Sequence, residues 1–200
     1  MFKPEVRHDV PLIPVVGDAF CFPYLVDLTV KKGILGVTGL RFDVSDDNGA
    51  SLLGVHGKLW QFRRKKRTIS DSSGFPILTM RSKALALRNV WSIYKGESSD
   101  ENDLIYTVQE SKVLQMKIRL DVFMAGNRGE ICNFHVKGSY TSQNFKVYKG
   151  DTLIAEVKEK VKIGYFFKGI EKFDVRVYPG ADYAFVVSLL VILNDIDGGS

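Results

Sequence analysis

Apolar and polar residues alternate with a period of two along much of this chain. Apolar side chains occupy every second position in three stretches, residues 104–108, 116–122 and 173–177. Such alternation is typical of β-strands with one buried face, as found in antiparallel sheets. Turn-forming segments such as Asn48-Gly49 separate these stretches at the spacing of all-β folds. The pattern predicts about a dozen strands between residues 24 and 178.

The segment DYAFVVSLLVILND, residues 182–195, breaks this pattern because it is apolar at almost every position. A membrane-spanning helix needs about 20 apolar residues, more than this segment offers, so no transmembrane span is expected. A buried central strand would explain its many β-branched residues. A helix explains more, because the segment is longer than most strands and follows a turn-forming YPG and a candidate N-cap, Asp182. We therefore expect a helix over about residues 182–194.

A helix that is apolar on every side has to be surrounded on every side. An open sheet covers only part of a helix, whereas a closed sheet of about a dozen strands encloses it completely. The sequence therefore predicts a mainly β protein, a closed antiparallel β-barrel of about 12 strands that encloses a hydrophobic C-terminal α-helix. We expect one domain over residues 18–200, preceded by an extended leader over residues 1–17.

Composition limits the class of protein further. Hydrophobic residues make up 45% of the 200-residue chain and aromatic residues 12%, which is enough to bury a core. The formal net charge of +5 permits an anionic partner without requiring one. Two cysteines, Cys21 and Cys132, are too few for a disulfide framework, and acids and prolines near the N-terminus argue against a signal peptide. These features favour a cytoplasmic protein.

The most unusual polar feature is a run of cations between two predicted strands. It contains Lys58, Arg63, Arg64, Lys65, Lys66 and Arg67, with no acid among them. A solvated hairpin tip would account for this run without any function. The run also suits a phosphoinositide or another anionic phospholipid, since each basic residue near such a membrane contributes about 1 kcal/mol. A nuclear-localisation or nucleic-acid-binding patch is the third interpretation.

Candidate catalytic and metal-binding residues are few. The three histidines lie in unrelated segments, and Cys132 and His135 would face opposite sides of one strand. Asp43, Ser45 and Asp47 have the spacing of a calcium loop, but the glycine at its sixth position and the glutamate at its twelfth are missing. We therefore expect no enzymatic activity, no metal site and no cofactor.

Three stretches carry a family resemblance, DLIYTVQESKVLQMKIRLDVFM, CNFHVKGSY and above all VYPGADYAFVVSLLVILNDID. With similarity elsewhere between about Phe20 and Asp197, they closely resemble the plant LURP-one-related proteins. The resemblance implies a fold like the tubby C-terminal domain, a barrel around a central hydrophobic helix, which phospholipid scramblases share. No tubby lipid site aligns residue by residue with this chain, so the resemblance assigns no ligand-binding residue.

The same resemblance implies a link to plant defence against pathogens. The tubby relatives bind phosphoinositides and have been proposed as membrane-tethered transcription factors. We therefore expect a non-enzymatic binding or regulatory module that acts in the cytoplasm, at the periphery of a membrane or in the nucleus. Its expected partners are an anionic phospholipid or phosphoinositide and an unknown protein, with nucleic acid as a further class. The alternatives are a scramblase-like lipid-handling protein and a protein-interaction scaffold.

Overall fold

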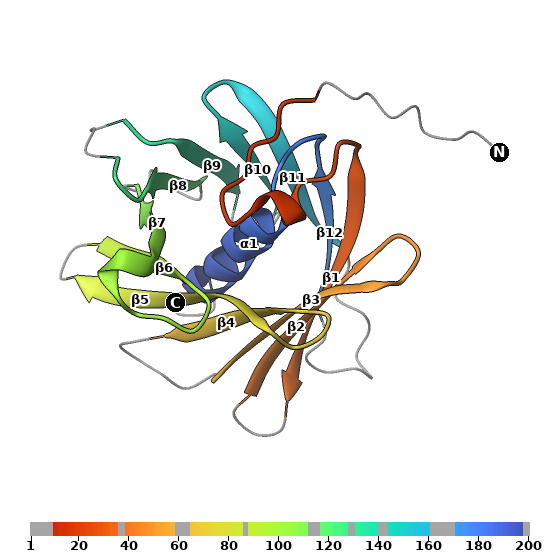
Figure 1. Ribbon diagram of the computed structural model, residues 1–200, viewed down its shortest axis with the longest axis horizontal. Helices are drawn as coiled ribbons and strands as arrows, with labels where there is room; N and C mark the ends of the chain where they lie inside the picture. Colours follow the sequence, from red (N-terminus) through yellow and green to blue (C-terminus); the bar gives the residue numbers. More distant parts are fainter. Residues whose placement is uncertain are drawn as a thin grey trace.

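The computed structural model confirms the predicted fold class, a closed antiparallel β-barrel of twelve strands with one C-terminal helix inside it. The strands form a ring around the helix α1 (Figure 1). The structure describes residues 10–35, 39–58, 65–85, 88–111, 117–127, 131–139, 144–160 and 171–197.

The elements follow one another along the chain in the order in which they lie around the barrel. The strands are β1 (Val26–Leu35), β2 (Gly39–Asp46), β3 (Ser51–Lys58), β4 (Lys66–Asp71), β5 (Pro76–Leu85), β6 (Arg88–Lys95), β7 (Leu104–Glu110), β8 (Lys117–Met124), β9 (Phe134–Ser139), β10 (Asn144–Lys149), β11 (Thr152–Lys160) and β12 (Glu171–Val177). The helices are two short 3-10 turns, η1 (Asp18–Phe20) and η2 (Glu101–Asp103), and the α-helix α1 (Tyr183–Asp197).

Each strand pairs with its neighbours in sequence, and β1 pairs with β12 to close the barrel. In the closing pair Val26 lies opposite Val177, and Val30 lies opposite Phe173. We call the end of the barrel where β12 finishes and α1 begins the entry end. The other end, where α1 finishes at Asp197, is the exit end. Closure leaves no free strand edge in the ring, so every strand is paired on both sides.

The core consists of the inward faces of the strands and all sides of α1. The alternating residues of β12 that were expected inside are buried, and Ala184, Phe185, Val186 and Val187 at the start of α1 are 0% exposed. The helix ends three residues later than the predicted 182–194, because its last turn continues to Asp197 at the exit end. Complete enclosure explains why a helix without a polar face is stable here.

One polar residue in the middle of α1 is accommodated by its own partners. The Ser188 hydroxyl donates a hydrogen bond to the Phe185 carbonyl at 2.6 Å, and the Tyr106 hydroxyl lies 2.5 Å from Ser188 Oγ. Because the single hydroxyl hydrogen of Ser188 is used in the bond to the carbonyl, the Tyr106 hydroxyl donates the hydrogen bond to Ser188 Oγ. Both residues are buried, so these hydrogen bonds offset the loss of water.

The turn predicted at Asn48-Gly49 joins β2 to β3. Gly49 has φ 84°, a left-handed conformation that glycine adopts without steric cost. The Asp46 carboxylate accepts hydrogen bonds from the backbone N–H groups of Asn48 and Ala50 at 3.0 and 2.7 Å. Asp43, part of the calcium-like spacing, instead bonds the Arg41 guanidinium at 2.7 Å. These acids therefore serve the hairpin.

A segment before β1 closes the entry end over the start of α1. The Asp182 carboxylate caps α1 by accepting from the Phe185 N–H at 3.0 Å, as predicted from its position. Its second oxygen accepts from the N–H groups of Val15, Val16 and Gly17 at 3.1, 2.7 and 3.2 Å. Burial raises the pKa of Asp182, and these N–H donors act in the opposite direction. One carboxylate thus fastens residues 15–17, the end of the predicted leader, to the helix.

Aromatic rings complete this closure. The Phe22 ring stacks on Tyr183 with centroids 5.4 Å apart, and the Phe20 ring meets the same tyrosine edge-on at 5.6 Å. The first nine residues of the predicted leader lie outside the described part of the chain.

Candidate functional site

The interior of the barrel is filled by α1, so the groups that can meet a ligand lie on the outer surface and at the two ends. Leu189, Val191 and Ile192 in the second half of the helix are 0% exposed. A buried side chain of this kind contributes packing and no recognition. Recognition of a ligand therefore falls to the outer surface and to the two ends of the barrel.

Two residues of the cationic run are attached to the last turn of α1 at the exit end. Arg67 is only 1% exposed, and its Nη2 donates to Asp195 Oδ1 at 2.8 Å. The Lys65 ammonium donates to the backbone carbonyl of Asp195. A cation at a helix C-terminus interacts favourably with the helix dipole, so both contacts stabilise the end of α1. Arg67 is therefore an internal structural residue, which a membrane or nucleic acid cannot reach in this conformation.

The other residues of the predicted site differ in their exposure and in how much of them the structure describes. Lys66 is exposed on the outer face of β4, between the two attached cations in sequence. Lys58 ends β3, and nothing is described of its side chain, while Arg63 and Arg64 fall outside the described residues. The structure thus places Lys65, Lys66 and Arg67 together at the exit end, and anion binding by the run stays a prediction.

Asp195 is the partner that the sequence did not reveal. It is 7% exposed, and its second carboxylate oxygen, Oδ2, has no hydrogen-bond partner among the described residues. An acid in the last turn of a helix is unfavourable for the helix dipole, which was a usable sign that a cation would accompany it. Alternation was a second sign, because Arg67 is two positions from the buried Ile69 and so shares its inward face.

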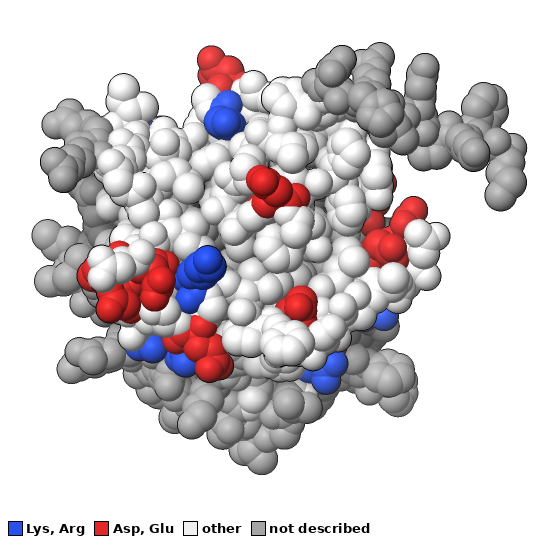
Figure 2. Space-filling model, viewed as in Figure 1, with Lys and Arg blue, Asp and Glu red and all other residues white. Residues whose placement is uncertain are grey.

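The entry end is rich in acidic residues, in contrast to the cations at the exit end. The described loops and strand ends there carry nine acids: Asp18, Asp46, Asp47, Asp71, Glu97, Asp100, Glu101, Asp103 and Asp151. Acidic side chains gather over the loop that joins β6 to β7 (Figure 2). Lys95 and Lys149 flank these loops. Since the whole chain has a net charge of +5, its positive charge is displaced away from the entry end.

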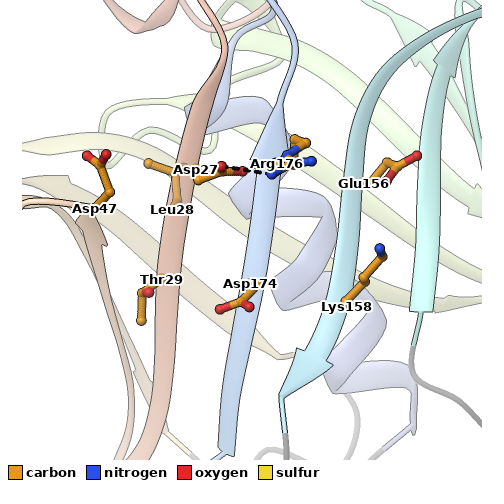
Figure 3. A pocket seen from close by; sticks show the side chains of 8 residues that line it. All are labelled: Asp27, Leu28, Thr29, Asp47, Glu156, Lys158, Asp174 and Arg176. Atoms are coloured by element: carbon orange, nitrogen blue, oxygen red, sulfur yellow. Dashed lines mark hydrogen bonds and ion pairs between the residues drawn. The ribbon is translucent and has the colours of Figure 1, made fainter. Parts of the chain in front are cut away.

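A groove of about 370 Å³ crosses the outer face of the barrel where β1, β12 and β11 lie side by side (Figure 3). Six of its eight lining residues are charged: Asp27, Asp47, Glu156, Lys158, Asp174 and Arg176. Asp27 and Arg176 point toward each other from neighbouring strands, with hydrogen bonds of 2.8 and 3.0 Å between them. The Arg176 hydrogen bond lowers the pKa of Asp27.

Register explains this arrangement. Asp27 lies opposite Arg176, and Arg176 lies opposite Glu156 on β11. Glu156 in turn bonds Lys146 on β10 at 3.2 Å. Opposite charges that face each other across strands stabilise a sheet. Four of the six charged lining residues are acids and two are cations. The groove therefore keeps an excess of negative charge, even though Asp27 pairs with Arg176 and Glu156 with Lys146.

Groups suited to catalysis do not come together among the described residues. The His135 ring stacks on Tyr148 with centroids 5.2 Å apart, and its pKa is lowered by burial and by the neighbouring cations Lys137 and Arg119. Both cysteines are free thiols. Burial, assisted by the Asp182 and Asp18 carboxylates, raises the pKa of Cys21 to about 11, far from that of an activated thiol.

The part of the chain that the structure describes contains no group of three or more histidine, cysteine, aspartate or glutamate side chains placed to hold a metal ion. It also has no helix with the length and apolar character needed to cross a membrane.

The fold and its surface define a class of protein: a closed antiparallel barrel filled by its own C-terminal helix, with charged groups on the outside. A protein-family model described as LURP-one-related matches residues 26–195. LURP-one-related 14 of Arabidopsis thaliana is 43% identical over 197 residues, which cover 96% of this chain and 95% of that protein. LURP1 of the same plant is 36% identical over 92% of this chain and 89% of its own length. The chain belongs to the LURP-one-related family.

A solved structure supports the fold independently. An X-ray structure of a protein from Arabidopsis thaliana superposes with a TM-score of 0.68 at 33% sequence identity. The match covers 92% of this chain and 98% of that one. Family membership and the helix-filled barrel predicted from the sequence are therefore both confirmed.

Proposed function

We propose that this protein is a non-enzymatic regulatory module that binds anionic phospholipid, such as a phosphoinositide, through the cationic run at its exit end. The ligand-binding residues are Lys58, Arg63, Arg64, Lys65 and Lys66. Arg67 has a separate role, since it positions the run by pairing with Asp195. In this proposal the protein works at the periphery of a membrane, and the family resemblance suggests plant defence as the setting.

The observation that carries this proposal is the attachment of the run to the barrel. Lys65 and Arg67 both bond Asp195, so Lys65 and the start of β4 are fixed at one end of the molecule while Lys66 is exposed. The acidic loops lie at the entry end, away from an anionic surface that the exit end would face. This charge distribution would orient the barrel on such a surface, and each basic residue near it contributes about 1 kcal/mol.

Co-sedimentation with vesicles tests the proposal. The test variant carries Arg63→Ala, Arg64→Ala and Lys66→Ala, which removes three charges and leaves the Arg67–Asp195 pair intact. The matched control carries Lys31→Ala, Lys95→Ala and Lys149→Ala, three exposed lysines elsewhere on the barrel. Wild type and control should sediment with vesicles that contain phosphoinositide at moderate salt, and the test variant should remain in the supernatant.

Equal sedimentation of the test variant and the control would contradict the proposal. Binding by neither would also contradict it and would leave the protein-interaction scaffold as the better interpretation. Vesicles of neutral lipid serve as the blank.

A further inference from the structure

A second anion-binding feature lies on the side of the barrel, on strands β9, β10 and β11. A shallow hollow of about 230 Å³ opens there and is separate from the cationic run. Three of its lining residues are lysines, Lys137, Lys146 and Lys158, one from each strand. Ser139 and Asn144 add polar side chains to the same hollow.

Cations lie next to one another across these strands. Lys137 on β9 lies directly opposite Lys146 on β10 and directly opposite Arg119 on β8. Directly opposed residues have Cβ atoms about 5 Å apart, and like charges at such positions destabilise a sheet. All three residues are exposed on the outer face. A row of this kind gains stability from an anion that bridges it.

Internal carboxylates pair with two of these three cations, Arg119 and Lys146. Arg119 Nε lies 3.6 Å from Asp121 Oδ1. Glu156 lines the hollow and bonds Lys146 at 3.2 Å. Within the described residues Lys137 has no carboxylate partner, and its ammonium lies 5.4 Å from the centre of the Tyr148 ring. Asp174 is opposite Lys158 in the register, but the Lys158 side chain leads away from it, toward Glu156 (Figure 3).

The pKa of the neighbouring His135 is also affected by these cations. His135 has a lowered pKa, and after burial the largest causes are Lys137 and Arg119. A field that disfavours protonation of an imidazole favours a nearby anion. Lysine ammonium groups and a serine hydroxyl are donors suited to the oxygens of a phosphate group.

We propose that the hollow on β9–β11 is a binding site for a phosphate group, held by Lys137, Lys146 and Lys158 with Ser139 and Asn144 as further hydrogen-bond partners. The hollow is large enough for the phosphate and part of the molecule that carries it. The carrier is a small soluble phosphate ester or a phospholipid headgroup, which share this chemistry.

Nuclear magnetic resonance with inorganic phosphate as the probe tests the site. Wild-type protein is titrated with phosphate while chloride is withdrawn to keep the ionic strength constant. We expect saturable shifts of the backbone amides in residues 137–139, 144–146 and 156–158. A Lys137→Gln, Lys158→Gln variant should bind at least about tenfold more weakly, because two charge-assisted hydrogen bonds are lost. A Lys95→Gln, Lys149→Gln variant, with the same loss of charge, should titrate as wild type does.

Shifts that do not saturate, or equal shifts in both double variants, would overturn the proposal. Vesicles containing phosphatidic acid distinguish the two carriers. If the carrier is a headgroup, Lys137→Gln, Lys158→Gln lowers co-sedimentation; if it is a soluble ester, co-sedimentation is unchanged and glycerol 3-phosphate binds at this hollow. Because the cationic run is intact in this variant, the outcome is independent of the proposed function.

Discussion

The buried pair between Arg67 and Asp195 is the interaction whose loss should be easiest to measure. Arg67→Ala would leave the Asp195 carboxylate, which is 7% exposed, without its cation. Asp195→Ala would likewise leave the Arg67 guanidinium buried without this anion. In the part of the chain that the structure describes, the Oδ2 atom of Asp195 has no hydrogen-bond partner, so little else would stabilise this carboxylate after the loss of Arg67.

The expected cost follows from burial. Removing one partner of a buried ion pair costs about 3–5 kcal/mol, because the remaining charge stays in a medium of low polarity. For a domain of this size 1 kcal/mol corresponds to about 2–4 °C in Tm, so each single variant should melt about 6–20 °C below wild type. Replacing both residues by apolar ones, as in Arg67→Met with Asp195→Leu, should restore much of the loss, because no buried charge remains.

Thermal and denaturant unfolding of wild type, the two single variants and the double variant measures these values. Asp27→Ala is the matched control, since it breaks an ion pair with Arg176 whose side chains are 49% and 51% exposed. Solvent screens that pair, so its loss should change Tm far less. Single variants at the exit end that melt within the range of the control would refute the reasoning. A double variant less stable than both singles would refute it as well.

Three further predictions concern the helix and its closure. Leu190→Asp should prevent folding, since an unpaired carboxylate inside the barrel costs several kcal/mol of a total stability of about 5–15 kcal/mol. A soluble Leu190→Asp protein that melts cooperatively would exclude the enclosed helix. Asp182→Ala should destabilise the protein by about 2 kcal/mol or more through the lost cap and N–H bonds, and limited proteolysis should then cut within residues 10–20; unchanged proteolysis would contradict this. Cys21 should react slowly with iodoacetamide at pH 8 in the native state and faster as the pH approaches its pKa of about 11, whereas rapid labelling at neutral pH would show that the thiol is activated.

The fold was predictable because its main signals are local. The period-two alternation in β7, β8 and β12 identifies the buried faces, and the described positions, such as Tyr106, Leu120 and Val175, are buried as expected. The all-round apolarity of α1 then requires enclosure, and a closed sheet provides it. The length of α1 was underestimated, since its last turn continues through Asp195, whose contact with Arg67 on β4 cannot be read from a linear pattern.

The candidate sites were less predictable because they depend on register. The sequence showed a run of cations but not that Arg67 turns inward to meet Asp195, 128 positions away. The row of Arg119, Lys137 and Lys146 is likewise invisible in the chain, where these residues lie on three consecutive strands, 18 and 9 positions apart. The register of the strands decides which residues lie opposite each other. Loop lengths and bulges set that register, and single residues of the sequence encode them only weakly.

Hydrogen exchange with and without phosphoinositide vesicles tests the central claim, that this protein binds an anionic surface from outside while α1 stays in the barrel. The account predicts slower exchange of the backbone amides around Lys65 and Lys66 on binding, and no change in the strong protection of residues 184–193. Faster exchange of the α1 amides in the presence of vesicles would contradict the account, because it would show that the helix leaves the barrel for the membrane.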